Sequence, residues 1–360
     1  MVARGGGRGT VATARMIGAM ELPAAAVRRC SVDEALALLA SPDAAEECSV
    51  AHGCAALVVD GGADEWPDEA LTPAQRRTLE WLPCVTVAPG EGAGWRRFDV
   101  VAQPEGTGDL ATAEDLLAAV SARPEAAAAL VRLVRVARRS DPQTGLWAES
   151  VTYGLLQAGR EFASWRAAAP GVTAGAPGAV RVERSAAGTT VTLVRPERHN
   201  ALDVALRDAL VGALRAAALD EGPVTLRGDG PSFCSGGDLA EFGTFPDPVR
   251  AHLVRSTRLP AQVVAALRHR LTVEVHGTCV GAGVELASFA GRVVAAPGST
   301  FRLPEVAMGL VPGSGGTWSV TRRLGTQRTN WLALTGATLD VDRALRWGLV
   351  DEVSGGTLEG

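Results

Sequence analysis

The chain has 360 residues, enough for about two domains, and its 47% hydrophobic and 21% charged residues are typical of a soluble globular protein. These proportions exclude a mostly disordered chain, and the net charge of −5 argues against a nucleic-acid-binding protein, which usually carries a basic stripe. All 35 basic residues are arginine, so Schiff-base chemistry on a lysine is excluded as well.

The first part of the chain combines short elements with a long helical stretch. Residues 1–29 begin with glycine-rich sequence and are predicted to be loose, and they contain neither a signal-peptide core nor a membrane-length apolar run. We therefore expect a cytoplasmic protein with no membrane partner. The block 30–167 is predicted to hold a helix at 32–39, a strand at 55–60, a helix from 73, strands at 84–89 and 98–102, and helices over 112–165 that break at Pro124 and Pro142.

Six cysteines are scattered along the chain, which does not indicate a disulfide framework in a protein of this length. The stretch from Cys48 to Cys54, with His52 between them, weakly resembles a set of metal ligands. It lacks the C-x₂-C spacing of structural zinc sites and a fourth ligand nearby. The sequence therefore predicts no metal.

A Pro/Gly/Ala-rich linker at 168–178 separates the first block from a second one at 179–360. The second block is predicted to begin with a hairpin that turns at 187–188, followed by a helix at 202–219 and strands at 224–227, 272–275 and 292–296. Helical segments separate these strands. Strands that alternate with helices indicate an α/β sheet with crossover connections.

Two glycine-rich turns in the second block each follow a strand and open a helix. The first contains Ser235 and the second contains Ala282. Such turns leave backbone N–H groups unpaired, and two of these groups can stabilise one oxyanion. The glycine spacing does not fit a dinucleotide fingerprint, the lysine of a P-loop is missing, and no G-x-S-x-G elbow forms at Ser232 or Ser235.

Two acids lie near these turns. Glu285 is in the first turn of the helix after Gly283, and Glu305 lies just past the predicted strand at 292–296. Apolar neighbours would raise the pKa of both carboxyls, as acid–base catalysis requires. Spacing alone leaves a second interpretation open, in which Glu285 only complements a helix dipole and Glu305 is an ordinary loop acid.

Five motifs in one order resemble the enoyl-CoA hydratase/isomerase (crotonase) superfamily over about half of the chain. They are Arg195-Pro-Glu-Arg-His-Asn-Ala-Leu202, Phe233-Cys-Ser-Gly-Gly-Asp-Leu239, His276-Gly-x₃-Gly-Ala-Gly-Val-Glu-Leu-Ala287, Leu303-Pro-Glu-Val-x₂-Gly309 and Val311-Pro-Gly-Ser-Gly-Gly-Thr317. The resemblance implies an α/β spiral of ββα units, an acyl-CoA or carrier-protein thioester as substrate, no cofactor beyond the CoA of the substrate, and a homo-oligomer, either a trimer or a hexamer.

The resemblance also implies roles for individual residues. The N–H groups of Ser235 and Ala282 would form the oxyanion hole, and Glu285 and Glu305 would be the catalytic pair of a hydratase. That pair would hold one water, which adds across the double bond of a 2-enoyl-CoA. The residues implied to bind substrate are Arg195, Arg198, Ala201, Gly237, Asp238, Leu239, Gly281 and Gly309.

Several alternatives remain at this point. The site would also suit an isomerase, a thioester hydrolase or a decarboxylase, and the chain would also serve as a non-catalytic acyl-CoA-binding subunit. Arg302 and Trp318-Ser319 depart from the residues common in the family. Relatives continue past the equivalent of Val353 into helices that cover the CoA site, and residues 109–165 resemble those helices in order. We therefore hypothesise that residues 30–167 are a degenerate crotonase-like half that donates these helices; the alternative is an unrelated N-terminal domain.

Overall fold

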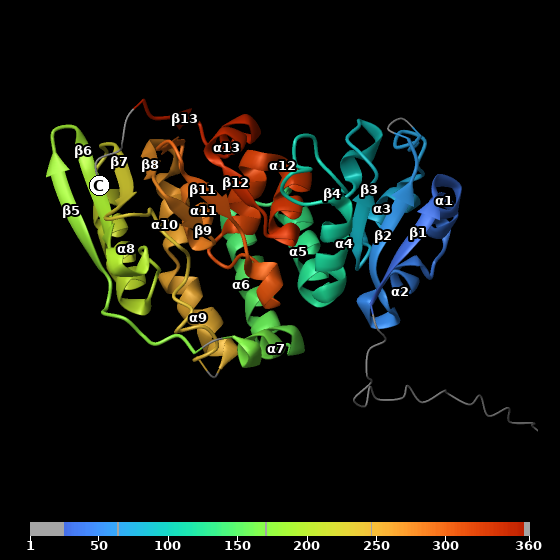
Figure 1. Ribbon diagram of the computed structural model, residues 1–360, viewed down its shortest axis with the longest axis horizontal. Coiled ribbons are helices and arrows are strands. Elements are labelled where there is room, and N and C mark those ends of the chain that lie inside the picture. The colour runs from blue at the N-terminus through green and yellow to red at the C-terminus, as the bar shows by residue number, and fades with distance from the viewer. Residues whose placement is uncertain (1–24, 63–64, 170, 246, 356–360) are drawn as a thin grey trace, which may run out of the picture.

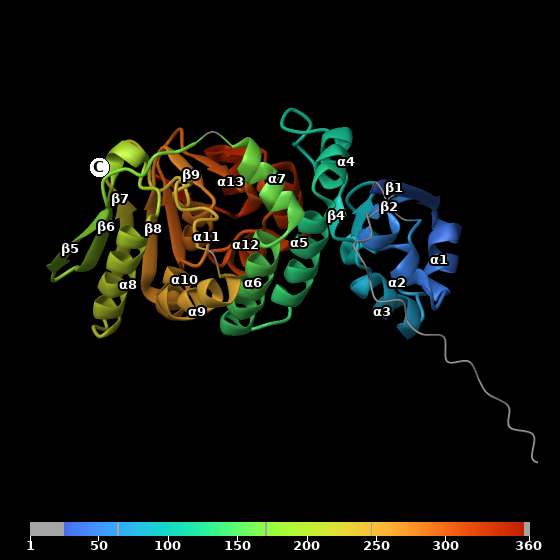
Figure 2. The same ribbon diagram turned by 90° about the horizontal axis from the view of Figure 1, so that it is seen from below.

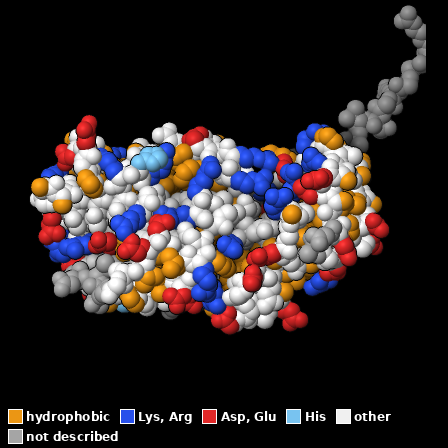
Figure 3. Space-filling view, turned by 90° about the horizontal axis from the view of Figure 1, so that it is seen from above, with side chains coloured by type: hydrophobic (Ala, Val, Ile, Leu, Met, Phe, Trp, Pro, Cys, Tyr) orange, Lys and Arg blue, Asp and Glu red, His pale blue; other side chains and the backbone are white. Residues whose placement is uncertain are grey.

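The computed structural model describes residues 25–62, 65–169, 171–245 and 247–355. The molecule is elongated, with one sheet near each end and a layer of helices between them (Figure 1). No helix within the described ranges is long and apolar enough to cross a membrane. On the face in Figure 3, small groups of arginine side chains and small groups of acidic side chains are distributed over the same surface.

The N-terminal sheet has four parallel strands in the order β1-β2-β3-β4. Its elements are β1 (Ala26–Ser31), α1 (Val32–Ala40), α2 (Ala44–Glu47), η1 (Val50–His52), β2 (Cys54–Asp60), α3 (Pro73–Trp81), β3 (Val85–Ala88), η2 (Gly94–Arg97) and β4 (Val100–Val101). β2 is buried along nearly its whole length, as expected for a central parallel strand with a continuous apolar run.

The prediction of a loose segment as far as residue 29 is wrong from residue 26 onward, because β1 begins there. β1 is an edge strand on which only Cys30 is buried, so it lacks the apolar pattern that marks a strand in sequence. Residues 1–24 lie outside the described part of the chain.

Four helices follow: α4 (Ala113–Ala122), α5 (Pro124–Ala137), α6 (Pro142–Gln157) and α7 (Arg160–Ala168). α5 and α6 begin at the two predicted prolines, where the missing N–H would have had no partner within the helix. Asp141 caps α6 by accepting hydrogen bonds from the N–H groups of Gln143 and Thr144. A further break, at Gly159, was not predicted.

The C-terminal half contains a six-stranded sheet in the order β13-β10-β8-β7-β6-β5 and a three-stranded sheet in the order β12-β11-β9. Its elements are β5 (Ala179–Ser185), β6 (Gly188–Val194), η3 (Pro196–Arg198), α8 (Val204–Ala218), β7 (Val224–Gly228), α9 (Pro248–Arg258), α10 (Pro260–Leu267), η4 (Arg268–Arg270), β8 (Leu271–Val275), β9 (Thr278–Val280), α11 (Ala282–Ala287), β10 (Arg292–Ala295), β11 (Thr300–Arg302), η5 (Glu305–Met308), α12 (Gly316–Thr335), β12 (Thr338–Asp340), α13 (Val341–Trp347) and β13 (Glu352–Val353).

The helices α5 and α6 pack directly against α12 of the C-terminal half (Figure 2). Gly145 on α6 allows this close approach, because a Cβ there would lie 2.6 Å from Cδ1 of Trp318. Polar contacts join α12 to the N-terminal sheet as well: the Asn330 side chain donates to the Asp99 carbonyl at 2.8 Å. One hydrophobic core therefore runs through both halves.

Candidate active site

A cavity of about 470 Å³ lies in the C-terminal half, with α6 forming part of its wall. Its lining includes five of the predicted site positions: Gly237, Asp238, Ala282, Glu285 and Glu305. Tyr153 and Gln157 of α6 also line it, so the N-terminal half contributes to the wall. Trp147 on the same helix is 62% exposed.

Glu285 projects from the first turn of α11 and is 2% exposed. One of its carboxylate oxygens, Oε2, accepts both the Ser314 N–H at 2.6 Å and the Gly316 N–H at 2.8 Å. Burial raises the pKa of Glu285 to about 7, against the opposing effect of these N–H donors. The carboxyl is therefore able to exchange a proton near neutral pH.

Glu305 begins η5, immediately after β11, and is also buried. Its Oε2 atom has no hydrogen-bond partner within the described residues. Burial, followed by the charge of Glu285, raises the pKa of Glu305 well above its usual value. Gly281 makes room for this side chain, because a Cβ at that position would lie 2.5 Å from Glu305 Oε1.

A third buried carboxylate, Glu149 of α6, was missed in the sequence. Its Oε1 accepts the Gly315 N–H at 2.6 Å, and its Oε2 accepts the N–H and the hydroxyl of Thr317 at 2.9 and 2.5 Å. Burial and then the charge of Glu285 raise the pKa of Glu149 to about 8. The available signal was helical spacing, which places Glu149 on the same buried face of α6 as Gly145 and Leu146.

The two predicted oxyanion donors, Ala282 and Ser235, differ in their position relative to the cavity. Ala282 lines the cavity and is the first residue of α11, where an N–H has no acceptor within the helix. The prediction for Ser235 is wrong: its N–H donates to the His199 carbonyl at 2.9 Å, and Ser235 does not line the cavity.

Gly237 is better placed than Ser235. Leu202 forms a parallel bridge to Gly237, in which the Leu202 N–H donates to the Gly236 carbonyl and the Leu202 carbonyl accepts the Asp238 N–H. Leu202 thus bonds to the residues on either side of Gly237, and in a parallel bridge the N–H of the residue between them points away from the partner strand. The Gly237 N–H therefore points away from Leu202, and Gly237 lines the cavity.

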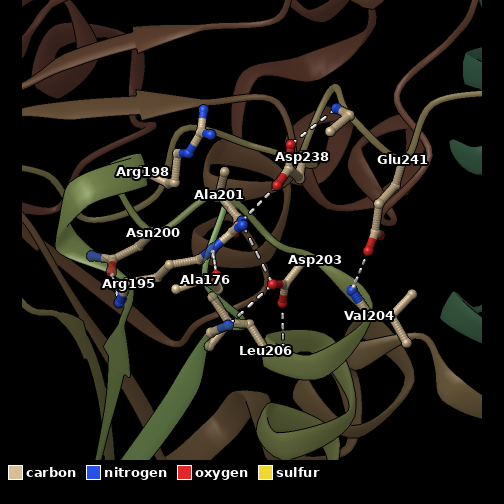
Figure 4. A network of polar contacts seen from close by, with 12 residues as sticks. Ala176, Arg195, Arg198, Asn200, Ala201, Asp203, Val204, Leu206, Asp238 and Glu241 are labelled. Atoms are coloured by element: carbon tan, nitrogen blue, oxygen red, sulfur yellow. Dashed lines mark hydrogen bonds and ion pairs between the residues drawn. The ribbon is translucent and has the colours of Figure 1, made fainter. Parts of the chain in front are cut away.

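Protein groups occupy the guanidinium of Arg195, a residue predicted to bind substrate (Figure 4). It is 2% exposed and pairs with Asp238 at 2.7 Å and with Asp203 at 3.4 Å. It also donates to the carbonyls of Ala176 and Ala201. The network ties the linker, the start of α8 and the first glycine-rich turn together.

We expect Arg195→Met to lower the free energy of unfolding by about 3–5 kcal/mol, because it leaves two buried aspartates without a counter-charge. Urea denaturation measures this loss. Arg181→Met is the matched control, since Arg181 pairs with Asp229 at the surface at 3.3 Å, and it should change the stability by less than about 1 kcal/mol. Equal effects of the two substitutions would contradict a structural role for the buried network.

The remaining predicted substrate contacts lie outside the cavity lining. Arg198 donates to the Thr173 carbonyl at 2.8 Å, and Ala201 supplies its carbonyl to Arg195. Leu239 is partly exposed beside a different hollow, next to Trp165. Gly309, at φ +75°, packs against the backbone of α7, where a Cβ would lie 2.6 Å from the Phe162 nitrogen. These positions shape the fold around the cavity in this structure.

The fold and the cavity together define a class of protein: an α/β protein whose cavity holds two buried carboxyls of raised pKa close to the start of a helix. The family description "Enoyl-CoA hydratase/isomerase" matches residues 183–356. The chain is 33% identical to the "Probable enoyl-CoA hydratase" of Rhodobacter capsulatus over 173 residues, which cover 48% of this chain and 67% of the relative. It is also 33% identical to a "Probable enoyl-CoA hydratase" of Mycobacterium tuberculosis over 180 residues, 48% of this chain and 68% of the relative.

The chain belongs to the enoyl-CoA hydratase/isomerase family. This confirms the resemblance, the crotonase-type α/β fold of the C-terminal half and the enzyme class expected from the sequence. A solved structure, the enoyl-CoA hydratase from Thermoplasma volcanium, aligns with 49% of this chain and 72% of its own at 27% identity and a TM-score of 0.45.

Proposed function

We propose that this enzyme adds water across the double bond of a 2-enoyl thioester of CoA, or removes it in the reverse direction. The observation that carries the proposal is the unpartnered Glu305 Oε2 in the cavity that also holds Glu285 and Ala282. A buried acceptor without a partner is costly, and a water or substrate atom would satisfy it.

The geometry supports a division of roles between the two acids. Glu285, with its pKa about 7, takes a proton from water as the water oxygen bonds to C3 of the substrate. Glu305, whose pKa is raised well above its ordinary value by burial, delivers a proton to C2. The N–H groups of Ala282 and Gly237 stabilise the negative charge that forms on the thioester oxygen. The reaction consumes one water and needs no oxidant or reductant.

We also propose that the N-terminal half is a degenerate repeat of the catalytic half. Both sheets contain four parallel strands in sequence order, β1-β2-β3-β4 in the first and β6-β7-β8-β10 in the second. The first set lacks a counterpart of α11, which carries Ala282 and Glu285. Helices α5–α7 follow the first set, and α6 supplies part of the wall of the catalytic cavity through Tyr153 and Gln157. Variants of Glu149, described below, test this contribution.

The experiment that tests the function follows the loss of enoyl-thioester absorbance with a panel of 2-enoyl-CoAs of varied chain length and aryl character. A 3-hydroxyacyl-CoA product, heavier by one water, is expected. Conversion without a change of mass would indicate an isomerase, release of free CoA a hydrolase, and tight binding without turnover a binding subunit. The same panel on a carrier protein tests the second thioester class. Assembly into a homo-oligomer and a cytoplasmic location stay predictions from the sequence.

A further inference from the structure

The loop before α12 binds carboxylates from both halves of the chain. The N–H groups of Ser314 and Gly316 donate to Glu285, and those of Gly315 and Thr317 donate to Glu149. Four consecutive N–H groups thus alternate between the two acids. They lie at the N-terminus of α12, whose first segment runs from Gly316 to a kink at Gly325, and the unpaired N–H groups and dipole of that segment favour negative charge.

We propose that Glu149 is a positioning residue of the reaction, which fixes the loop that aims Glu285. This inference rests on the proposed function. Glu149 lies outside the family-matched residues 183–356, so it makes the N-terminal half necessary for the chemistry as well as for the fold.

Glu149 acts through other groups, because it does not line the cavity. Three donors surround its two oxygens, so its carboxylate has a fixed position relative to the loop. Loss of this anchor lets the loop shift and misaligns Glu285, and a displacement of about 1 Å at a reacting group can cost about 100-fold in rate. Substrate binding, which uses the cavity wall, is left nearly unchanged.

The charge of Glu149 also affects the protonation of Glu305. The titratable and charged groups around Glu149 are Glu285 on α11, Glu305 on η5, Tyr153 on α6 itself and Arg255 on α9, whose guanidinium lies 5.1 Å from the Tyr153 ring centre. The charges of Glu285 and Glu149 both raise the pKa of Glu305. Glu149 carries this charge at pH values above its own pKa of about 8, so removing it lowers the pKa of Glu305 on the alkaline side of the profile, where the proton donor is then lost at lower pH.

The test compares Glu149→Gln with Glu161→Gln. Glu161 is a matched control: it is buried on α7 and accepts two backbone N–H groups, from Glu125 and Ala126 at 2.8 and 3.0 Å, away from the cavity. For the thioester that the wild type turns over, Glu149→Gln should lower kcat about 10- to 100-fold with little change in KM. The alkaline limb of its pH profile should move to lower pH. Glu161→Gln should leave both unchanged.

A second readout needs no turnover. Carboxyls with a raised pKa bind more protons in the folded than in the unfolded state, so the wild type loses stability as pH rises from about 4.3, the unfolded value, through the folded pKa about 8 of Glu149. Urea denaturation at intervals across this range should show a smaller loss for Glu149→Gln. This holds even if the wild type fails on every thioester, an outcome that would reject only the proposed hydratase.

Three outcomes overturn the role of Glu149. They are an unchanged kcat and pH profile, a rise in KM that accounts for the whole effect, and an equal effect of Glu161→Gln. If Glu149→Gln does not fold, Thr317→Val removes only the hydroxyl bond of 2.5 Å, and it should shift kcat and the alkaline limb in the same direction by less. No shift in that variant would overturn the proposal.

An independent observation concerns the core of the N-terminal half. The sulfur atoms of Cys48, Cys54 and Cys84 all lie within 4.8 Å of one another, and all three residues are buried. His52, which the sequence placed with Cys48 and Cys54, is not part of this group: its ring contacts Ser49 and Glu46. The third ligand, Cys84, comes from far along the chain, just before β3.

From this geometry we infer a site for one soft, thiophilic cation of the Cu(I) class, bound by three thiolates. Metal–sulfur bonds of about 2.3 Å in a plane place sulfur atoms roughly 4 Å apart, which this cluster reaches with small side-chain movements. The cluster brings together three ligands, which favours a three-coordinate soft ion over tetrahedral zinc.

Anaerobic titration of the full chain with Cu(I), against a competing chelator, tests this site. One equivalent should bind and raise the Tm, and Cys84→Ser should abolish both effects. Cys30→Ser is the matched control, because Cys30 is buried in the neighbouring strand but outside the cluster, and it should bind Cu(I) as the wild type does. Absence of binding, preference for Zn²⁺ or equal binding by Cys84→Ser would overturn the proposal. If Cys84→Ser does not fold, Cys54→Ala takes its place.

Discussion

Glu285→Gln and Glu305→Gln are each expected to lower kcat for hydration about 10²- to 10⁴-fold, the usual contribution of a general acid or base. Hydration moves two protons, one from the attacking water and one to C2, so each acid is needed once per turnover. Rates of absorbance loss with saturating enoyl-CoA measure the effect, and the KM should stay within about threefold of the wild type.

Both substitutions remove a proton site and little else. The two N–H donors of Glu285 converge on one oxygen, so an amide oxygen there keeps both bonds. The Oε2 of Glu305 has no partner, so an amide nitrogen in its place breaks no existing contact. Glu161→Gln, on α7, again serves as the control. Loss of activity in only one of the two variants would exclude the hydratase and favour an isomerase, which needs a single base.

The residues that the sequence brought to one cavity lie in the ordered motifs that carry the family resemblance. Glu285 and Glu305 each follow a glycine-rich or strand-end turn, and Ala282 begins a helix, so motif order was enough to bring them to one cavity. The two prolines at 124 and 142 fixed the starts of α5 and α6, because proline is favoured in the first helical turn.

The residues that the sequence misplaced depend on long-range pairing. The backbone contacts of His199 and Leu202 determine which N–H is free, the one at Ser235 or the one at Gly237. Both partners lie more than thirty positions upstream. The resemblance implies that Arg195 binds substrate, and its ion pairs with Asp203 and Asp238 become visible only in the folded chain. Glu149 looks like an ordinary helix acid until α6 is placed against the loop before α12.

Three short strands were missed for a related reason. β9, β11 and β12 have three residues each, too few to display an alternating pattern. They form a small sheet that is held by pairing with one another, with Phe301 opposite Cys279 on one side and Leu339 on the other. This sheet sets the start of α11 and the position of Glu305, so the geometry of the site rests on elements that local sequence does not reveal.

Ala282→Pro is expected to lower kcat about 10²- to 10³-fold while leaving the fold intact, because it removes one oxyanion donor. Ala282 is the first residue of α11, a position where proline is tolerated since its N–H is not used by the helix. Gly281 before it has φ 50° and ψ −119°, the mirror image of an extended conformation that readily precedes proline. Steady-state kinetics and thermal unfolding measure the two effects together.

Ala113→Pro is the matched control, since Ala113 is the first residue of α4, follows an extended N-cap and lies outside the cavity. It should keep the activity and the Tm of the wild type. Full activity of Ala282→Pro would show that no ligand oxygen needs this N–H, and the thioester carbonyl would then have to lie elsewhere in the cavity. A low Tm in Ala282→Pro alone would mean that the N–H holds the fold. Loss of kcat at an unchanged Tm is the expected result, and it would show that the Ala282 N–H stabilises the negative charge on the thioester oxygen.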